Sequence, residues 1–243
     1  MAEASVISHA EQDTAVQRSR LRNLMETLVP YALILLVIWT PRSWQRYLWW
    51  VAAASVVIIT CISFDGLRAM GLRMTNFGRS LWIVGVALLL AGAAVLVAAR
   101  LHTLRLPASP VAFIATYCAY AIWSGVQQFL LQGVFLQRLL RLIPNSTRAA
   151  LAASLLFAIA HLPSAVLTPM TLIWGFAACL IFLRYRNLYS LALAHAILGI
   201  AVAITIPGPV DHNMRVGLGY LRYGHRHRPS ELPPVPPPLK PRS

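Results

Sequence analysis

The sequence predicts an all-α fold, a polytopic transmembrane helical bundle of about seven to eight spans. Of the 243 residues, 58% are apolar and 12% are charged, a composition typical of a chain that lies in a bilayer. Several apolar runs reach about 18 residues, which is long enough to cross roughly 30 Å of hydrocarbon. No aspartate or glutamate occurs between Asp65 and Asp211, so the central spans lack carboxylates.

Seven apolar runs are the predicted helices, and the first and sixth of them are short. A polar segment, residues 1–24, precedes them without the compact apolar core and small-residue cleavage site of a secretory signal. The first run is therefore expected to act as the insertion signal. The runs are Met25 to Thr40, Tyr47 to Phe64, Leu81 to Ala99, Val111 to Leu136, Ala149 to Val166, Met170 to Leu183 and Tyr189 to Ile206.

The basic residues of the short loops predict the orientation, because arginine and lysine favour the cytoplasmic side. A cytoplasmic N-terminus, in a bacterial inner membrane, places eleven arginines on that side against four in the opposite short loops. Seven spans would leave the basic C-terminal tail outside, whereas an eighth segment or a re-entrant end near Ile200 to Val216 would bring it inside. The eleven are Arg18, Arg20, Arg22, Arg68, Arg73, Arg79, Arg138, Arg141, Arg148, Arg184 and Arg186.

The chain divides into four parts. The polar residues 1–24 and the N-terminal helices 25–110 come first, and a core at residues 111–206 carries most of the polar groups inside spans. Residues 207–243 combine a segment suited to the membrane interface, Met214 to Tyr223, with a proline-rich end that should be extended and disordered. The net charge of +14 is spread over loops and tail rather than gathered on one element, which excludes nucleic acid as a partner.

Five polar side chains inside the core spans are the candidate functional site, since polar groups in hydrocarbon are costly and usually have a function. A rise of about 1.5 Å per residue, counted from the nearest arginines, puts Gln128 and His161 roughly 20 Å deep. The same count puts Gln132 and His195 at roughly 13 Å. Ser124 shares a helix face with these glutamines. The five are Gln127, Gln128, Gln132, His161 and His195.

Three of the apolar spans carry the strings QQFLLQG, FAIAH and HAILG, in this order. They resemble the motifs of the CAAX protease and bacteriocin-processing (CPBP) family of intramembrane endopeptidases, which includes the type II CAAX prenyl endopeptidases. The resemblance extends over roughly Val111 to Ile206. The family motifs EExxxRG, FxxxH and HxxxN are represented in order by QQFLLQG, FAIAH and HAILG. The corresponding positions are Gln127, Gln128, Gln132 and Gly133, then Phe157 and His161, then His195 and Gly199.

The departures from the family motifs concern the groups on which catalysis depends. The resemblance implies that the first glutamate and the histidines activate a water, while the last histidine and the asparagine stabilise the oxyanion. Here glutamines replace both glutamates and the arginine, and Gly199 replaces the asparagine. A glutamine amide cannot take up a proton as a carboxylate does, and a general base contributes about two to four decades of rate.

Two hypotheses follow for the function. In the first, the protein is a hydrolase that cleaves a membrane protein or peptide, with His161 or His195 as the base and the glutamine amides orienting the water. In the second, it is a catalytically silent relative whose pocket, including Ser124, Phe157 and Gly199, binds a transmembrane or lipid-linked peptide as a chaperone, immunity or assembly factor.

A transporter and a metal enzyme are less well supported by the sequence. The central spans have no acidic carrier for protons or cations. His161 and His195 supply two metal ligands where catalytic zinc usually has three, so a divalent metal is only a weak candidate cofactor, with Asp211 or His212 as a third ligand if the chain folds back. The three cysteines lie inside spans without CxxC spacing, which predicts buried thiols.

Overall fold

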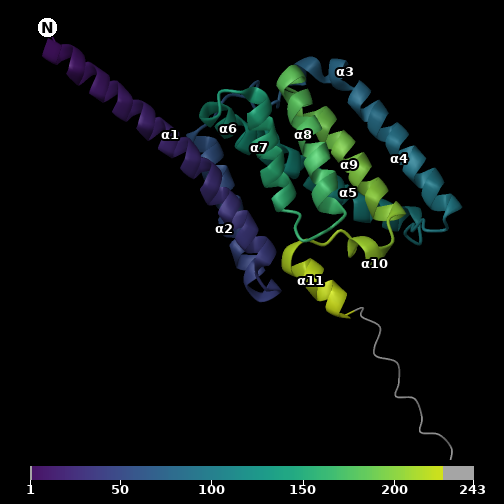
Figure 1. Cartoon of the computed structure of the whole chain (residues 1–243). Coiled ribbons are helices and arrows are strands. Elements are labelled where there is room, and N and C mark those ends of the chain that lie inside the picture. Colours follow the sequence, from purple (N-terminus) through teal and green to yellow (C-terminus); the bar gives the residue numbers. More distant parts are fainter. Residues whose placement is uncertain (1, 227–243) are drawn as a thin grey trace, which may run out of the picture.

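The structure, a computed structural model, describes residues 2–226, and the side chains of residues 17–223. Every regular element in this part of the chain is a helix (Figure 1), which confirms the predicted all-α fold. Each of the seven predicted spans contains a helix. The predicted proline-rich end lies outside the described residues.

The first two helices form an antiparallel pair at one side of the bundle (Figure 1). Helix α1 runs from Ala2–Trp39 and α2 from Arg42–Ile62. Pro41 separates them, and a residue before proline disfavours the helical conformation, so α1 ends at Trp39. The candidate membrane span Gln17–Trp39 on α1 contains the apolar run that begins at Met25.

Helix α4 (Trp82–Arg100) follows the short turns η1 (Met74–Asn76) and α3 (Phe77–Ser80), and packs against α9. Helix α5 (Pro110–Gln128) then begins with a capped N-terminus, because the Ser109 hydroxyl accepts a hydrogen bond from the Ala112 amide at 3.2 Å and Pro110 occupies the first turn. The predicted span from Val111 to Leu136, which carries the glutamines, is not α-helical throughout. Residues Phe129–Leu136 form a π-helix, η2, before α6 (Gln137–Leu142).

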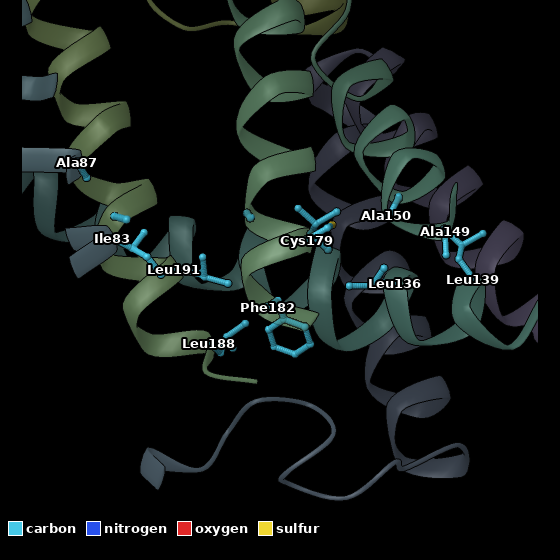
Figure 2. Close-up of a cluster of buried hydrophobic side chains, with 14 residues drawn as sticks. Ile83, Ala87, Leu136, Leu139, Ala149, Ala150, Cys179, Phe182, Leu188 and Leu191 are labelled. Atoms are coloured by element: carbon cyan, nitrogen blue, oxygen red, sulfur yellow. The ribbon is translucent and has the colours of Figure 1, made fainter. Parts of the chain in front are cut away.

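Helices α7 (Ser146–Ile159), α8 (Leu167–Tyr185) and α9 (Leu188–Thr205) complete the bundle. Asn145 and Asn187 cap α7 and α9 through their side-chain oxygens. A Cβ at Gly175 would lie 3.1 Å from the Phe157 ring, so this glycine lets α7 and α8 pack closely. Figure 2 shows the apolar core to which α4, η2, α6, α7, α8 and α9 contribute, with Cys179 and Phe182 fully buried.

Between α9 and residue 226, where the description ends, the chain forms two short helices, α10 (Gly208–Asp211) and α11 (Gly217–Arg226). Both are too short to cross about 30 Å of hydrocarbon. Gly217 packs against Ile38 near the end of α1, and its amide donates to the Leu162 carbonyl at 2.7 Å. Up to Arg226, the chain therefore turns along the end of the bundle that holds the end of α1 (Figure 1), and no eighth span is formed there.

Among the residues that the structure describes, length and hydropathy alone identify five helices that could cross a membrane: Gln17–Trp39 of α1, α2, α4, α8 and α9. Helix α7 is apolar but has 14 residues, because Pro163 lacks an amide hydrogen and ends the predicted span early.

The prediction of three buried thiols was wrong for two of them. Cys61 and Cys118 are exposed on the helical bundle, and Cys179 is buried.

A buried ionic cluster joins α1, α6 and the loop after α2. The Arg138 guanidinium is inaccessible, with its Nε 3.4 Å from Glu26 and an Nη 3.7 Å from Asp65. The guanidinium also donates to the carbonyls of Gly133 and Ser63, and Asp65 pairs with Arg141. The described acidic side chains of this cluster, Glu26 and Asp65, are thus both paired with arginines.

Candidate functional site

The glutamines of the polar span lie where α5 passes into the π-helix. Ser124, Gln128 and Gln132 are fully buried, as their spacing of four residues predicts. The Ser124 hydroxyl donates to the Tyr120 carbonyl within α5 at 3.0 Å. A π-helix has a wider turn than an α-helix and often occurs at functional sites, and here it begins directly after Gln128.

A directed chain of hydrogen bonds links this span to α9. The Gln132 amide nitrogen donates to the Gln128 amide oxygen at 3.4 Å, and the Gln128 amide nitrogen lies 3.1 Å from His195 Nδ1. An amide NH₂ can only donate, so His195 Nδ1 accepts. A neutral His195 consequently carries its proton on Nε2.

His161 has the opposite arrangement of its ring proton. It lies in the turn after α7, and its Nδ1 is 2.7 Å from the Phe157 carbonyl oxygen. The last carbonyls of a helix have no partner within the helix, and a carbonyl can only accept, so His161 Nδ1 donates. Neutral His161 therefore has an unprotonated Nε2. The prediction that His161 and Phe157 both lie on a helix is corrected by this turn.

Aromatic rings bring the two imidazoles into one group. The Phe157 ring centroid lies 4.8 Å from that of His161 and 5.9 Å from that of His195, both edge-on. Trp174 on α8 lies 6.0 Å from His195. Its indole N–H is buried and has no hydrogen-bond acceptor within the described part of the chain, which leaves an unused donor beside His195.

Gly199 creates space for a tyrosine of α5. A Cβ at Gly199 would lie 1.8 Å from the Tyr120 hydroxyl oxygen and 2.5 Å from the ring carbon that bears it. Tyr120 can occupy this position only because residue 199 has no side chain. Tyr120 shares its helix face with Ser124 and Gln128, so its hydroxyl group extends the polar row toward α9.

The Gly199→Ala substitution is expected to destabilise the protein by about 1–3 kcal/mol, because a methyl group would force Tyr120 out of its place. Thermal unfolding of the purified protein measures this loss. The Gly199→Ala, Tyr120→Ala double variant is expected to be less destabilised than the two single effects added together. Simple additivity would contradict the contact. Gly92→Ala is the control, since a Cβ there meets no atom within 4 Å.

Gln127 does not join this network. Its side chain is half-buried and makes no hydrogen bond to another described residue.

The hydrogen bond between Gln128 and His195 joins two residues that the estimate of membrane depth from the sequence had placed at different levels. The count assumed a uniform α-helical rise from Arg141, whereas η2 has the different geometry of a π-helix.

The acidic residues with described side chains stay away from the imidazoles. Glu26 and Asp65 belong to the Arg138 cluster, and Asp211 accepts from the Asn213 amide at 2.8 Å. His212 stacks on Tyr220 rather than joining His161 and His195. Within the described part of the chain, no three or more His, Cys, Asp or Glu side chains form a group that could hold a metal ion.

Sequence reasoning missed three contributors to the site. Tyr120 could have been found, because it precedes Ser124 by four residues as Ser124 precedes Gln128. Trp174 lies on a uniformly apolar helix and gave no periodic signal. Gln137 donates to the Gln132 carbonyl at 3.1 Å and accepts from Arg186, and this link between the start of α6 and the end of α8 is indicated by no residue spacing.

The comparison with family models gives one match. Residues 107–201 match the model of the type II CAAX prenyl endopeptidase Rce1-like family, which confirms the resemblance predicted for Val111 to Ile206. The matched region covers less than half of the chain and holds every residue of the hydrogen-bonded network from Tyr120 to Gly199. No match was found among curated proteins or among solved structures.

Proposed function

Because residues 107–201 match the type II CAAX prenyl endopeptidase Rce1-like family, a family of proteases, we propose that this integral membrane protein is an intramembrane endopeptidase that uses imidazole as its base. The observation that supports the proposal most strongly is the pair of opposite tautomers. His161 has an unprotonated Nε2 and His195 a protonated one, as their hydrogen bonds to Phe157 and Gln128 require.

The reaction divides between the two histidines. His161 Nε2 takes a proton from a water molecule, and the resulting hydroxide attacks the carbonyl carbon of the scissile peptide bond. His195 Nε2–H donates to the oxyanion that forms. The proton held by His161 then passes to the leaving nitrogen as the C–N bond breaks.

The glutamines position His195 rather than exchange protons. Gln128 holds Nδ1 in the accepting state, and Gln132 fixes the Gln128 amide by donating to its oxygen. Loss of this chain would allow the imidazole to rotate or to change its tautomer. An ionised carboxylate can only accept and would require a protonated Nδ1, so the glutamine amide is what allows His195 to carry its proton on Nε2. A glutamine takes up no proton, which leaves proton transfer from water to His161.

In this proposal Trp174 is a second donor to the oxyanion, because its buried indole N–H has no other partner among the described residues. The Trp174→Phe substitution is therefore expected to lower kcat by about two to three decades, the usual worth of one oxyanion donor, while the aromatic packing around His195 is kept. Steady-state cleavage of a substrate peptide measures the change. The Trp82→Phe variant is the control, since Trp82 is exposed and donates to Tyr185 away from the site. An unchanged kcat for Trp174→Phe would exclude the indole N–H from the reaction.

The N-terminal peptides of the membrane proteome test the proposed activity. Deletion cells are complemented with the wild-type protein or with the His161→Ala, His195→Ala variant at equal expression. New termini that depend on both histidines are the expected result, and they identify a membrane protein or peptide substrate. Equal sets of termini in the two strains would contradict proteolysis.

A silent, peptide-binding role is the second candidate, and a specific observation favours it. The described acidic side chains are all engaged away from the imidazoles, so the pocket offers hydrogen bonds without a carboxylate base. Under this alternative, the double histidine variant leaves the termini unchanged but loses capture of a transmembrane or lipid-linked peptide.

We also place the start of α1 on the cytoplasmic side of a bacterial inner membrane. The arginines near this end of the bundle support this orientation through the preference of basic loops for the cytoplasm. Cysteine labelling from each side of the membrane, at an added Ser19→Cys and an added Thr103→Cys, tests it. Labelling of position 19 from outside would contradict the placement.

A further inference from the structure

A polar cavity of about 520 Å³ lies between α1, the end of α2 and α6, away from the site described above. Arg20, Arg22 and Asn23 line it from α1, Ser63 from the end of α2, and Arg141 from α6. The cavity borders the Glu26 and Asp65 cluster, because Arg22 Nε lies 3.6 Å from Glu26 and Arg141 pairs with Asp65.

The charges around this cavity do not cancel. Among the described side chains, three guanidinium groups line the cavity, those of Arg20, Arg22 and Arg141, and that of Arg138 lies next to it. The described carboxylates there are those of Glu26 and Asp65, which leaves two positive charges in excess. Arg20 forms no ion pair with a described side chain. The excess charge predicts an anionic ligand, and arginine is well suited to the geometry of phosphate.

An apolar groove of about 520 Å³ adjoins the polar cavity on the neighbouring face of α1. Leu21 and Leu24 line it from α1, and Leu139, Leu142 and Ile143 line it from α6 and its end. Arg20 belongs to both hollows. Residues 17, 20, 21 and 24 follow helical spacing, so a single ligand could contact the charged and the apolar face at once.

The level of the two hollows in the membrane agrees with this arrangement. Arg20 and Arg22 lie near the N-terminal end of the candidate membrane span Gln17–Trp39. The apolar run from Met25 follows them, which places both arginines near the boundary between hydrocarbon and headgroups. The groove continues toward Leu24, deeper along the same span. The charged group of the ligand therefore lies at the surface and its chain points into the membrane.

We propose that α1, α6 and the end of α2 form a binding site for an anionic phospholipid, with the phosphate group between Arg20, Arg22 and Arg141 and an acyl chain in the groove of Leu21 and Leu24. A phospholipid matches the two hollows better than free phosphate, which would leave the apolar groove unoccupied. The site is independent of the proposed hydrolytic activity and is tested without it.

Binding of phosphatidylglycerol and of phosphatidylcholine with the same acyl chains is measured by native mass spectrometry on the full-length protein in detergent. Wild-type protein is expected to bind phosphatidylglycerol about tenfold more tightly or better, as two basic residues near an anionic headgroup predict. The Arg20→Gln, Arg22→Gln variant is expected to lose this preference. The matched control is Arg79→Gln, Arg148→Gln, which removes two exposed arginines outside the cavity and should keep it.

Each other outcome overturns the proposal. Equal affinity of the wild-type protein for the two lipids would exclude an anionic site. An equal loss of the preference for phosphatidylglycerol in the control variant would show that the overall charge of the protein, rather than this cavity, causes the preference. Inorganic phosphate that displaces the lipid completely at comparable concentration would show a phosphate site without a lipid.

The single variant Arg20→Gln tests the same lipid preference and keeps every described ion pair. Misfolding therefore cannot explain a loss of the preference in this variant. The Leu21→Asn, Leu24→Asn variant should weaken phosphatidylglycerol binding if the groove holds a chain.

Discussion

Replacing His161 with Gln is expected to lower peptide-bond cleavage by about two to four decades, the usual contribution of a general base. Glutamine can still donate to the Phe157 carbonyl, so the turn after α7 is kept while the basic Nε2 is lost. The measurement is single-turnover cleavage of a substrate found through the termini comparison. The rate is expected to rise again when imidazole is added to a His161→Gly variant, because a soluble base can then occupy the vacated space.

The control for His161 is His102→Gln, since His102 is an exposed imidazole in the turn after α4. This variant is expected to cleave at the wild-type rate. A His161→Gln protein that cleaves as fast as wild type would exclude His161 as the base. Loss of cleavage without rescue by imidazole would instead assign His161 a structural role.

The Arg138→Met substitution is expected to reduce the free energy of unfolding by about 3–5 kcal/mol, the usual loss when one member of a buried ion pair is removed. Arg138 is fully buried, and its loss would leave the largely buried Glu26 without its buried partner. The carbonyls of Gly133 and Ser63 would lose a donor as well. Reversible unfolding of the purified protein in mixed micelles measures the change.

Arg148→Met is the matched control for Arg138, because Arg148 is exposed and should contribute within about 0.5 kcal/mol. The Glu26→Gln, Arg138→Met double variant is expected to be more stable than the sum of the single effects predicts, since no buried charge is then left unpaired at that contact. Equal stability of Arg138→Met and wild-type protein would contradict a structural role for the cluster.

The ionic cluster shows where sequence reasoning failed and why. Arg138 is one of the arginines that the sequence assigns to cytoplasmic loops. In the structure Glu26 and Arg138, which are 112 positions apart in the sequence, pair inside the bundle at 3.4 Å. Loop charge predicts the side of the membrane, but it contains no information on which arginine turns inward.

The sequence by itself determined the all-helical fold, the order and approximate bounds of the helices, and the polar residue types of the core. These follow from local properties: apolar length, the capping residues Ser109, Asn145 and Asn187, and the helix-ending effect of Pro41 and Pro163. The order of the motifs from Gln127 to Gly199 was sufficient for the family resemblance.

Only the tertiary structure decided which polar groups meet. The bond between Gln128 and His195 and the packing of Tyr120 on Gly199 join residues of different helices. These contacts left Gln127 outside the network and assigned the ring proton of His195, opposite to that of His161, through its partner Gln128. The physical reason is that residue spacing fixes the face of a helix, whereas hydrogen-bond partners and protonation depend on what the neighbouring helices bring to that face.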